Sequence, residues 1–209
     1  MTAQRLLSNT LLTNNNLPIK GLPMRSGLWT SAVMMSCLAV TSSLFAQEAT
    51  KFTVGDGKLE FKAPASWAKK TPKNRIIDVE YEVPAAKGDD LAGRMTVMGA
   101  GGTVEANIDR WIGQFDQPNG GDTKDKAKIE KLKVSGQDVQ WVDLSGTYKD
   151  NPAPFAGGKP VLRENYRMLA AIVQTKESGN FFLKFYGPKA TVSENEKAFR
   201  DLVDSMQVK

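Results

Sequence analysis

The side chains available for chemistry are carboxylates, amines and hydroxyls, because the 209 residues include no histidine and a single cysteine, Cys37. The absence of histidine excludes Ser-His-Asp and Cys-His hydrolysis, histidine-ligated zinc and the iron sites built from two histidines and a carboxylate. A single cysteine excludes an intramolecular disulfide, a four-cysteine zinc site and CxxC redox chemistry. We therefore expect no cofactor, and an enzyme would have to use carboxylates, Lys, Ser or Tyr.

Three acidic positions offer a catalytic or metal-binding interpretation, and each has a simpler one. Asp89-Asp90 would provide oxygen ligands for Ca²⁺ or Mn²⁺, but the pair follows a proline and is typical of a solvated turn. The loop 116–125 has no terminal glutamate at the spacing of a calcium loop. Asp143 lies on a predicted strand without an acidic partner, whereas acid catalysis needs two groups of different pKa. We predict no catalytic residue and no metal site.

The segment 149–163 is the strongest candidate for a binding surface. It connects two predicted strands and is too long for a plain hairpin turn. Long loops often carry function, and Phe155 is an apolar residue at the middle of this one. The alternative is that Phe155 folds back onto the sheet edge. The sequence predicts that a partner is contacted by Lys149, Phe155, Lys159 and Arg163.

Alternating strands and two amphipathic helices must position these residues. The spacing of apolar residues predicts helices at both 103–115 and the C-terminal end, where Ser193 and Glu196 have the spacing of a capping box. Residues 166–174 are apolar on both faces, which is typical of a strand in the middle of a covered sheet. The acidic face of strand 77–83 should lie in water. Strands are predicted at 52–54, 59–61, 77–83, 94–99, 127–134, 137–148, 166–174 and 181–186. The fold class is α+β, an antiparallel sheet of about six or more strands flanked by helices.

Two stretches resemble PsbP-like and Mog-type proteins. The run 57–70 has a strand, then Pro64, then Trp67 followed by basic residues, and 182–206 has a last strand, a Gly-Pro turn and a closing helix. The resemblance, to an exported bacterial member of this family, implies an α/β/α sandwich. It also implies a non-catalytic role, because the family is known for an extrinsic subunit of the oxygen-evolving complex and for a binder of the Ran GTPase. The matching residues are packing and turn residues, which concern fold and not activity.

The first 46 residues are expected to be a secretory signal peptide with an extended basic start. Between Arg25 and Glu48 lie 22 uncharged residues, ending in Leu-Phe-Ala at 44–46. Translation from Met24 would give a signal of ordinary length. A retained membrane anchor and lipidation at Cys37 are the alternatives. Residues 47–209 then form one PsbP/Mog-like domain with no stable membrane span.

The expected location is outside the cytoplasm, periplasmic or extracellular. Residues 47–209 contain 25 basic and 23 acidic residues in an interspersed order, which excludes a basic stripe for nucleic acid. The sequence favours an exported non-catalytic binding or accessory module, whose partner is a protein or a small ligand. A carrier of a small apolar or amphipathic ligand held between sheet and helix, and a carboxylate-based hydrolase, remain as alternatives.

Overall fold

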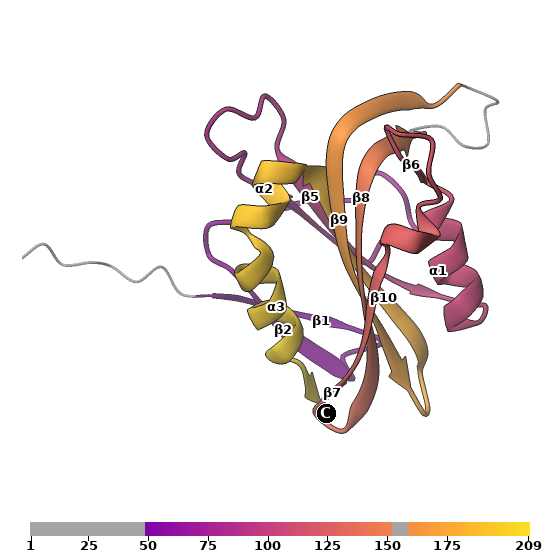
Figure 1. Ribbon diagram of the computed structural model, residues 1–209. Coiled ribbons are helices and arrows are strands. Elements are labelled where there is room, and N and C mark those ends of the chain that lie inside the picture. The colour runs from indigo at the N-terminus through magenta and orange to yellow at the C-terminus, as the bar shows by residue number, and fades with distance from the viewer. Residues whose placement is uncertain (1–48, 152–158) are drawn as a thin grey trace, which may run out of the picture. The chain divides into compact units, whose positions relative to one another are not determined.

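An eight-stranded antiparallel sheet forms the framework of the chain (Figure 1). The computed structural model describes residues 49–151 and 159–209, so the predicted signal segment lies outside the described residues. Seven strands follow the order β3-β4-β5-β10-β9-β8-β6, and β7 also pairs with β8. A second sheet has the order β1-β2-β11. The strands are β1 (Thr50–Val54), β2 (Leu59–Ala63), β3 (Ala68–Lys70), β4 (Val79–Val83), β5 (Gly93–Ala100), β6 (Phe115–Asp116), β7 (Lys128–Val134), β8 (Gln137–Asp150), β9 (Val161–Thr175), β10 (Gly179–Pro188) and β11 (Gln207–Val208).

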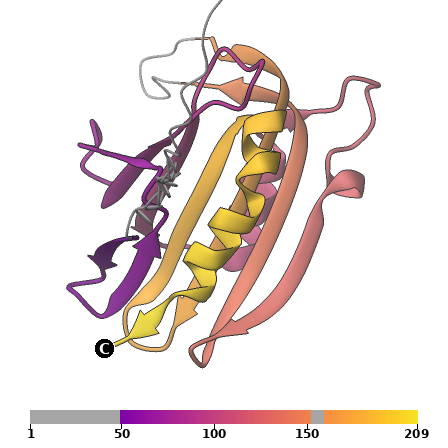
Figure 2. The same ribbon diagram turned by 90° about the vertical axis from the view of Figure 1, so that its left-hand side faces the viewer.

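Helices cover both faces of the large sheet. One face carries α1 (Val104–Ile112), whose Trp111 packs edge-on against Phe182 of β10 at 5.5 Å between ring centroids. The other face carries the small sheet together with α2 (Lys189–Glu194) and α3 (Glu196–Asp204). Figure 2 shows α2 and α3 lying along β9. The predicted class, an antiparallel α+β sheet flanked by helices, is confirmed.

Local signals in the sequence explain where α1 begins and ends. Thr103 accepts a hydrogen bond from the backbone N–H of Ala106 through its hydroxyl, and Glu105 lies in the first turn, where the helix dipole favours an acid. The helix ends at Ile112, three residues earlier than predicted, with Gly113 as its C-cap, because Phe115 begins β6. None of the helices among the described residues is long and apolar enough to cross a bilayer.

The expected capping box is wrong, and the expected exposure of the acidic face of strand 77–83 holds only in part. Ser193 lies inside α2 and does not cap the closing helix, and the Glu196 carboxylate accepts a hydrogen bond from Arg167 instead of closing a capping box. The acidic face of β4 is not fully in water either. The Glu80 side chain is 16% exposed because it pairs with Arg94 of the neighbouring strand β5.

Candidate functional site

The face of the large sheet that carries α1 extends beyond the end of this helix and is hollowed there. Along β10, Phe182 lies under α1, while Lys184 and Tyr186 follow on the same face because side chains alternate along a strand. A cavity of about 540 Å³ opens over this uncovered part. We call it the tyrosine pocket, and it is lined by Lys73, Asn74, Ile77, Ala92, Arg94, Thr96, Met98, Tyr148, Asp150, Asn151, Arg163, Tyr166, Lys184, Tyr186 and Gly187.

Lys184 lies at the floor of the pocket and is the most unusual residue in it. The residue is only 8% exposed, and its Nζ donates one hydrogen bond, of 2.7 Å, to Oε1 of Gln114 just beyond α1. Nζ also lies 4.9 Å from the ring centroid of Tyr186 and 5.3 Å from that of Tyr148, which are cation–π distances. Within the described part of the chain, no carboxylate forms an ion pair with Lys184. A buried ammonium is usually paired, so this one has unused capacity for an anion.

Burial, together with the positive charges of Arg110 and Arg94, lowers the pKa of Lys184 from 10.5 to about 7. The ammonium is therefore about half neutralised at neutral pH when nothing is bound. An anion placed beside it would favour the charged form and raise the pKa. A strongly shifted group in a pocket marks a candidate functional site.

Arg94 forms a fixed wall of the pocket. Its Nε and Nη2 donate to the two carboxylate oxygens of Glu80 at 2.8 and 2.9 Å, and its Nη1 donates to Oη of Tyr186 at 2.8 Å. This bidentate pair raises the pKa of Arg94 and lowers that of Glu80. The guanidinium has further N–H groups, held in a rigid fork that suits carboxylate and phosphate oxygens.

Three tyrosines supply the aromatic walls. The rings of Tyr148 and Tyr166 are parallel, with centroids 6.1 Å apart, and Tyr186 lies 5.2 Å from Tyr148. Burial raises the pKa of all three hydroxyls. They therefore stay protonated at physiological pH and can donate hydrogen bonds to an acceptor.

A β-bulge brings Arg163 to this pocket. Gly146 of β8 pairs with Tyr166 of β9, but Tyr148 pairs with Arg163, so two steps on β8 match three on β9. The extra residue is accommodated by Asn165, whose φ is 54°, a conformation that asparagine tolerates better than most residues. Residues three apart in a regular strand face opposite sides. The bulge therefore places Arg163 and Tyr166 on the same pocket.

The residues predicted to contact a partner are only partly brought together. Arg163 lines the pocket and lies 3.4 Å from a carboxylate oxygen of Asp150. Lys149 pairs instead with Asp116 of β6 at 2.8 Å, and Lys159 is exposed just before β9. Phe155 lies outside the described residues. Their role in contacting a partner stays a prediction.

The acidic candidates have structural partners. Asp143 is half-buried and receives two hydrogen bonds from Arg167, at 2.9 Å each, so its carboxylate is held as a charged partner. Asp89 accepts bonds from the hydroxyl and the backbone N–H of Thr191, and thereby attaches the loop after β4 to α2. Among residues 49–151 and 159–209 no group of three acidic or cysteine side chains has metal-binding geometry.

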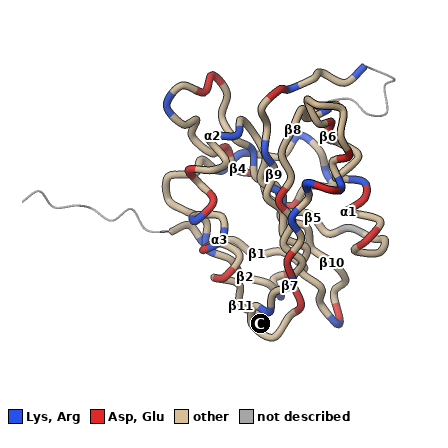
Figure 3. Tube along the Cα trace, in the orientation of Figure 1, with Lys and Arg blue, Asp and Glu red and all other residues tan. Residues whose placement is uncertain are grey.

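Sequence reasoning missed Lys184, Arg94 and the three tyrosines. A signal was present, because Lys184 stands between Phe182 and Tyr186 on one face of a strand that is otherwise apolar. Basic and acidic residues are interspersed along the chain (Figure 3), so counts of charge could not reveal the local excess in the pocket.

Comparisons with known proteins concern the fold. No protein-family model and no curated protein sequence matches the chain. Among solved structures, cyanobacterial PsbP (CyanoP) from Synechocystis sp. PCC 6803 is 13% identical with a TM-score of 0.45, and the match covers 82% of this chain and 99% of CyanoP. The Ran-binding protein Mog1p of Saccharomyces cerevisiae is 9% identical, also with a TM-score of 0.45, over 78% of this chain and 96% of Mog1p. A structure from Bacteroides thetaiotaomicron VPI-5482 is 13% identical with a TM-score of 0.41, over 78% of this chain and 49% of that one. The PsbP and Mog resemblance seen in the sequence is thus confirmed as a resemblance of fold alone.

Proposed function

We propose that this protein is an exported, non-catalytic binding module that holds a small organic anion in the tyrosine pocket. The observation that carries the proposal is Lys184, a buried ammonium that faces a cavity and has no carboxylate partner among the described residues. Burying an unpaired ammonium destabilises a fold, so its presence is best explained by a ligand that supplies the missing negative charge.

The rest of the lining supports an organic anion. Four basic side chains line the pocket, Lys73, Arg94, Arg163 and Lys184, against the single acid Asp150. Guanidinium groups and phenol hydroxyls offer donors to an anionic group, and the tyrosine rings offer flat apolar surface to the remainder of the ligand. A cavity of about 540 Å³ is of the size that small-molecule sites usually have.

This lining favours an anion-binding module over the two alternatives. A hydrolase that works with two carboxylates would need a second acid in the pocket, and Asp150 is the only acid among its lining residues. A carrier of a purely apolar ligand would not need buried charge. The sheet and α3 are packed directly against each other, with Trp141 and Phe199 at 5.4 Å, so the proposed ligand lies beyond α1 and not between sheet and helix.

Export is proposed on the sequence of residues 1–46. Intact mass measurement of the protein recovered from the periplasm or medium tests it. An N-terminus at Gln47 is expected, and a secreted form that still carries residues before Met24 would contradict the proposal.

Binding is tested by titration calorimetry with phosphate, sulfate and 4-hydroxybenzoate at pH 6. We expect 4-hydroxybenzoate to bind, and Lys184→Met and Arg163→Gln each to weaken it by at least about tenfold, as the loss of one charged hydrogen bond implies. Lys176→Met, at the exposed turn between β9 and β10, is the matched control and should leave binding unchanged. Equal binding by Lys184→Met and the unmodified protein would refute the proposal.

A protein partner is the second candidate function. Val161 and Leu162, within the predicted binding segment 149–163, are 45% and 61% exposed, and Lys159 precedes them. Neighbouring exposed apolar side chains of this kind favour a contact surface. The test is affinity purification from the exported fraction with Leu162→Ser and Lys159→Ala combined. A protein recovered equally with both forms would exclude this surface.

A further inference from the structure

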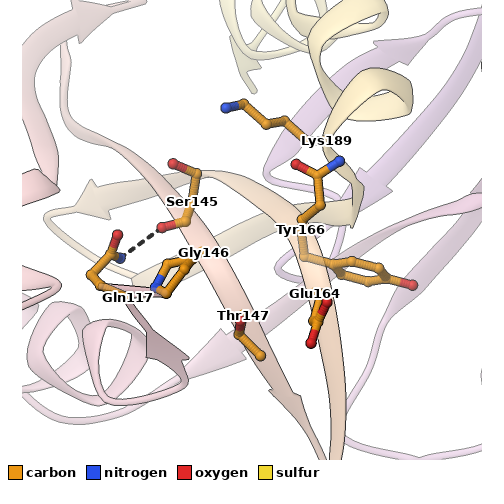
Figure 4. A pocket seen from close by; sticks show the side chains of 9 residues that line it. Gln117, Ser145, Gly146, Thr147, Glu164, Tyr166 and Lys189 are labelled. Atoms are coloured by element: carbon orange, nitrogen blue, oxygen red, sulfur yellow. Dashed lines mark hydrogen bonds between the residues drawn. The ribbon is translucent and has the colours of Figure 1, made fainter. Parts of the chain in front are cut away.

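A second hollow of about 520 Å³ lies beside the tyrosine pocket, and its chemistry is different. Seven of its nine lining residues have a polar side-chain group. Figure 4 shows Gln117 and Ser145 on one side of it and Glu164 and Tyr166 on the other. We call it the polar hollow. Its amide, hydroxyl, carboxylate and ammonium groups provide both donors and acceptors, which suits a neutral ligand part rich in hydroxyl groups.

Hydrogen bonds of Gln117 and a close backbone approach at Gly146 fix the backbone that lines the polar hollow. Gln117 donates through Nε2 to the backbone oxygen of Ser145 at 2.8 Å and to the hydroxyl of Thr123 at 3.2 Å. Gly146 has a φ of 151°, and a Cβ there would lie 2.6 Å from the backbone oxygen of Asp116. The hollow is therefore a built feature of the paired strands β6, β8 and β9, and Gly146 is required for their close approach.

Two charged side chains in the hollow have no partner among the residues that the structure describes. Glu164 and Lys189 form no ion pair or hydrogen bond in the described part of the chain, and both are exposed. Neither group is used to hold the fold together. Both are available to a ligand, and they can be substituted without breaking a structural contact.

Tyr166 lines both the polar hollow and the tyrosine pocket. Its ring stacks on Tyr148 on the pocket side, and the bulge at Asn165 places its neighbour Glu164 at the hollow. A ligand that extends past Tyr166 would thus meet mainly basic groups first, and next a mixture of hydrogen-bond donors and acceptors. An aromatic ring at such a junction offers a flat surface to the C–H face of a sugar ring.

Resting on the proposed function, we propose that the ligand is an acidic oligosaccharide, with its carboxylate or sulfate in the tyrosine pocket and the adjoining sugar ring in the polar hollow. The hydroxyls of that ring pair with Glu164, Lys189 and the amide oxygen of Gln117, whose Nε2 is already used within the fold. An acidic peptide fits less well. Pro118 is the only apolar side chain in the hollow besides the tyrosine ring, so a peptide side chain finds little apolar surface there.

The test compares galacturonate with trigalacturonate by titration calorimetry at pH 6, on protein purified from full-length expression. We expect trigalacturonate to bind at least about tenfold more tightly, the gain from a few hydrogen bonds. The double variant Glu164→Gln with Lys189→Met should lose this gain and keep the galacturonate affinity. Lys184→Met should weaken the binding of both ligands by at least about tenfold. Asp201→Asn with Lys197→Met, an exposed pair on α3, is the matched control and should change neither.

The outcomes separate the two proposals. If galacturonate and 4-hydroxybenzoate both fail to bind, the proposed function is refuted and this inference with it. If they bind and trigalacturonate gains nothing, only the acidic oligosaccharide is refuted. Triglutamate that binds as tightly as trigalacturonate, and loses affinity in the same double variant, would also overturn the sugar and assign the site to acidic peptides.

Discussion

Replacing Lys184 with methionine should make the protein more stable at pH 6 while weakening anion binding by at least about tenfold. Methionine has a similar length and fills the space between Tyr148 and Tyr186 without a charge. The pKa of Lys184 falls from 10.5 to about 7 on folding, which corresponds to about 5 kcal/mol of unfavourable burial of the charged form. The variant leaves Oε1 of Gln114 without its donor, at a cost of about 1–3 kcal/mol. The expected net gain in unfolding free energy is about 2–4 kcal/mol.

The sign of the pH dependence follows from the lowered pKa. Below about pH 7 both the folded and the unfolded chain carry the proton on Lys184, so the folded state bears the full penalty. Between about pH 7 and 10.5 the unfolded chain binds one proton more, and the stability of the unmodified protein therefore rises by about 1.4 kcal/mol per pH unit. The advantage of Lys184→Met should shrink at the same rate and be largely lost by pH 9.

Urea unfolding followed by tryptophan fluorescence at pH 6 and pH 9 measures both quantities. Lys176→Met controls for the loss of a surface lysine and should match the stability of the unmodified protein at both pH values, because this residue is exposed. A variant that unfolds at lower urea concentration than the unmodified protein at pH 6 would refute the reasoning. An advantage of equal size at both pH values would do the same, since it would not come from a titrating ammonium.

Three other changes test the surroundings of the pocket. Affinity for 4-hydroxybenzoate should fall as the pH rises from 6 to 9, because the unliganded Lys184 loses its proton near pH 7; calorimetry showing a constant affinity would contradict this. Asn165→Gly should preserve stability and binding, whereas Asn165→Val should cost about 1–2 kcal/mol in urea unfolding, since a β-branched residue is strained at a φ of 54°. Arg167→Met should lower the free energy of unfolding by about 3–5 kcal/mol, because it leaves the half-buried Asp143 carboxylate without its partner. Lys197→Met, which breaks an exposed pair on α3, should lower it by no more than about 1 kcal/mol. Similar losses in both variants would contradict the burial argument.

The periodicity of apolar residues was sufficient to locate most strands and the face each one buries. The strand around 166–174 was predicted to lie inside the sheet, and β9 lies between β8 and β10. The ladder also includes Val161 to Asn165, which are largely exposed and lack the apolar pattern. These residues form a strand because β8 pairs with them, which is a tertiary effect that single-strand patterns do not contain.

The pocket was beyond prediction because it depends on register. Glu80 and Arg94 lie fourteen residues apart, and their pairing requires the alignment of β4 with β5. Arg163 reaches the pocket only because of the bulge at Asn165, and one extra residue cannot be recognised from alternation that is already imperfect. Lys184 was visible as a lone charge in an apolar strand. That Lys184 faces a pocket could not be predicted, because this depends on where α1 ends.

The length of α1 also sets how the pocket could change. Nine helical residues span about 14 Å, whereas the fifteen residues of β9 span about 50 Å. A helix of this length cannot cover the full length of the strands, so part of the sheet face stays open. Adding one or two turns to α1 would close it over Lys184, and removing one would expose Trp111 and its apolar neighbours. The extent of the open sheet face thus depends on the length of α1, and insertions at Gly113, between α1 and β6, are the place to change it.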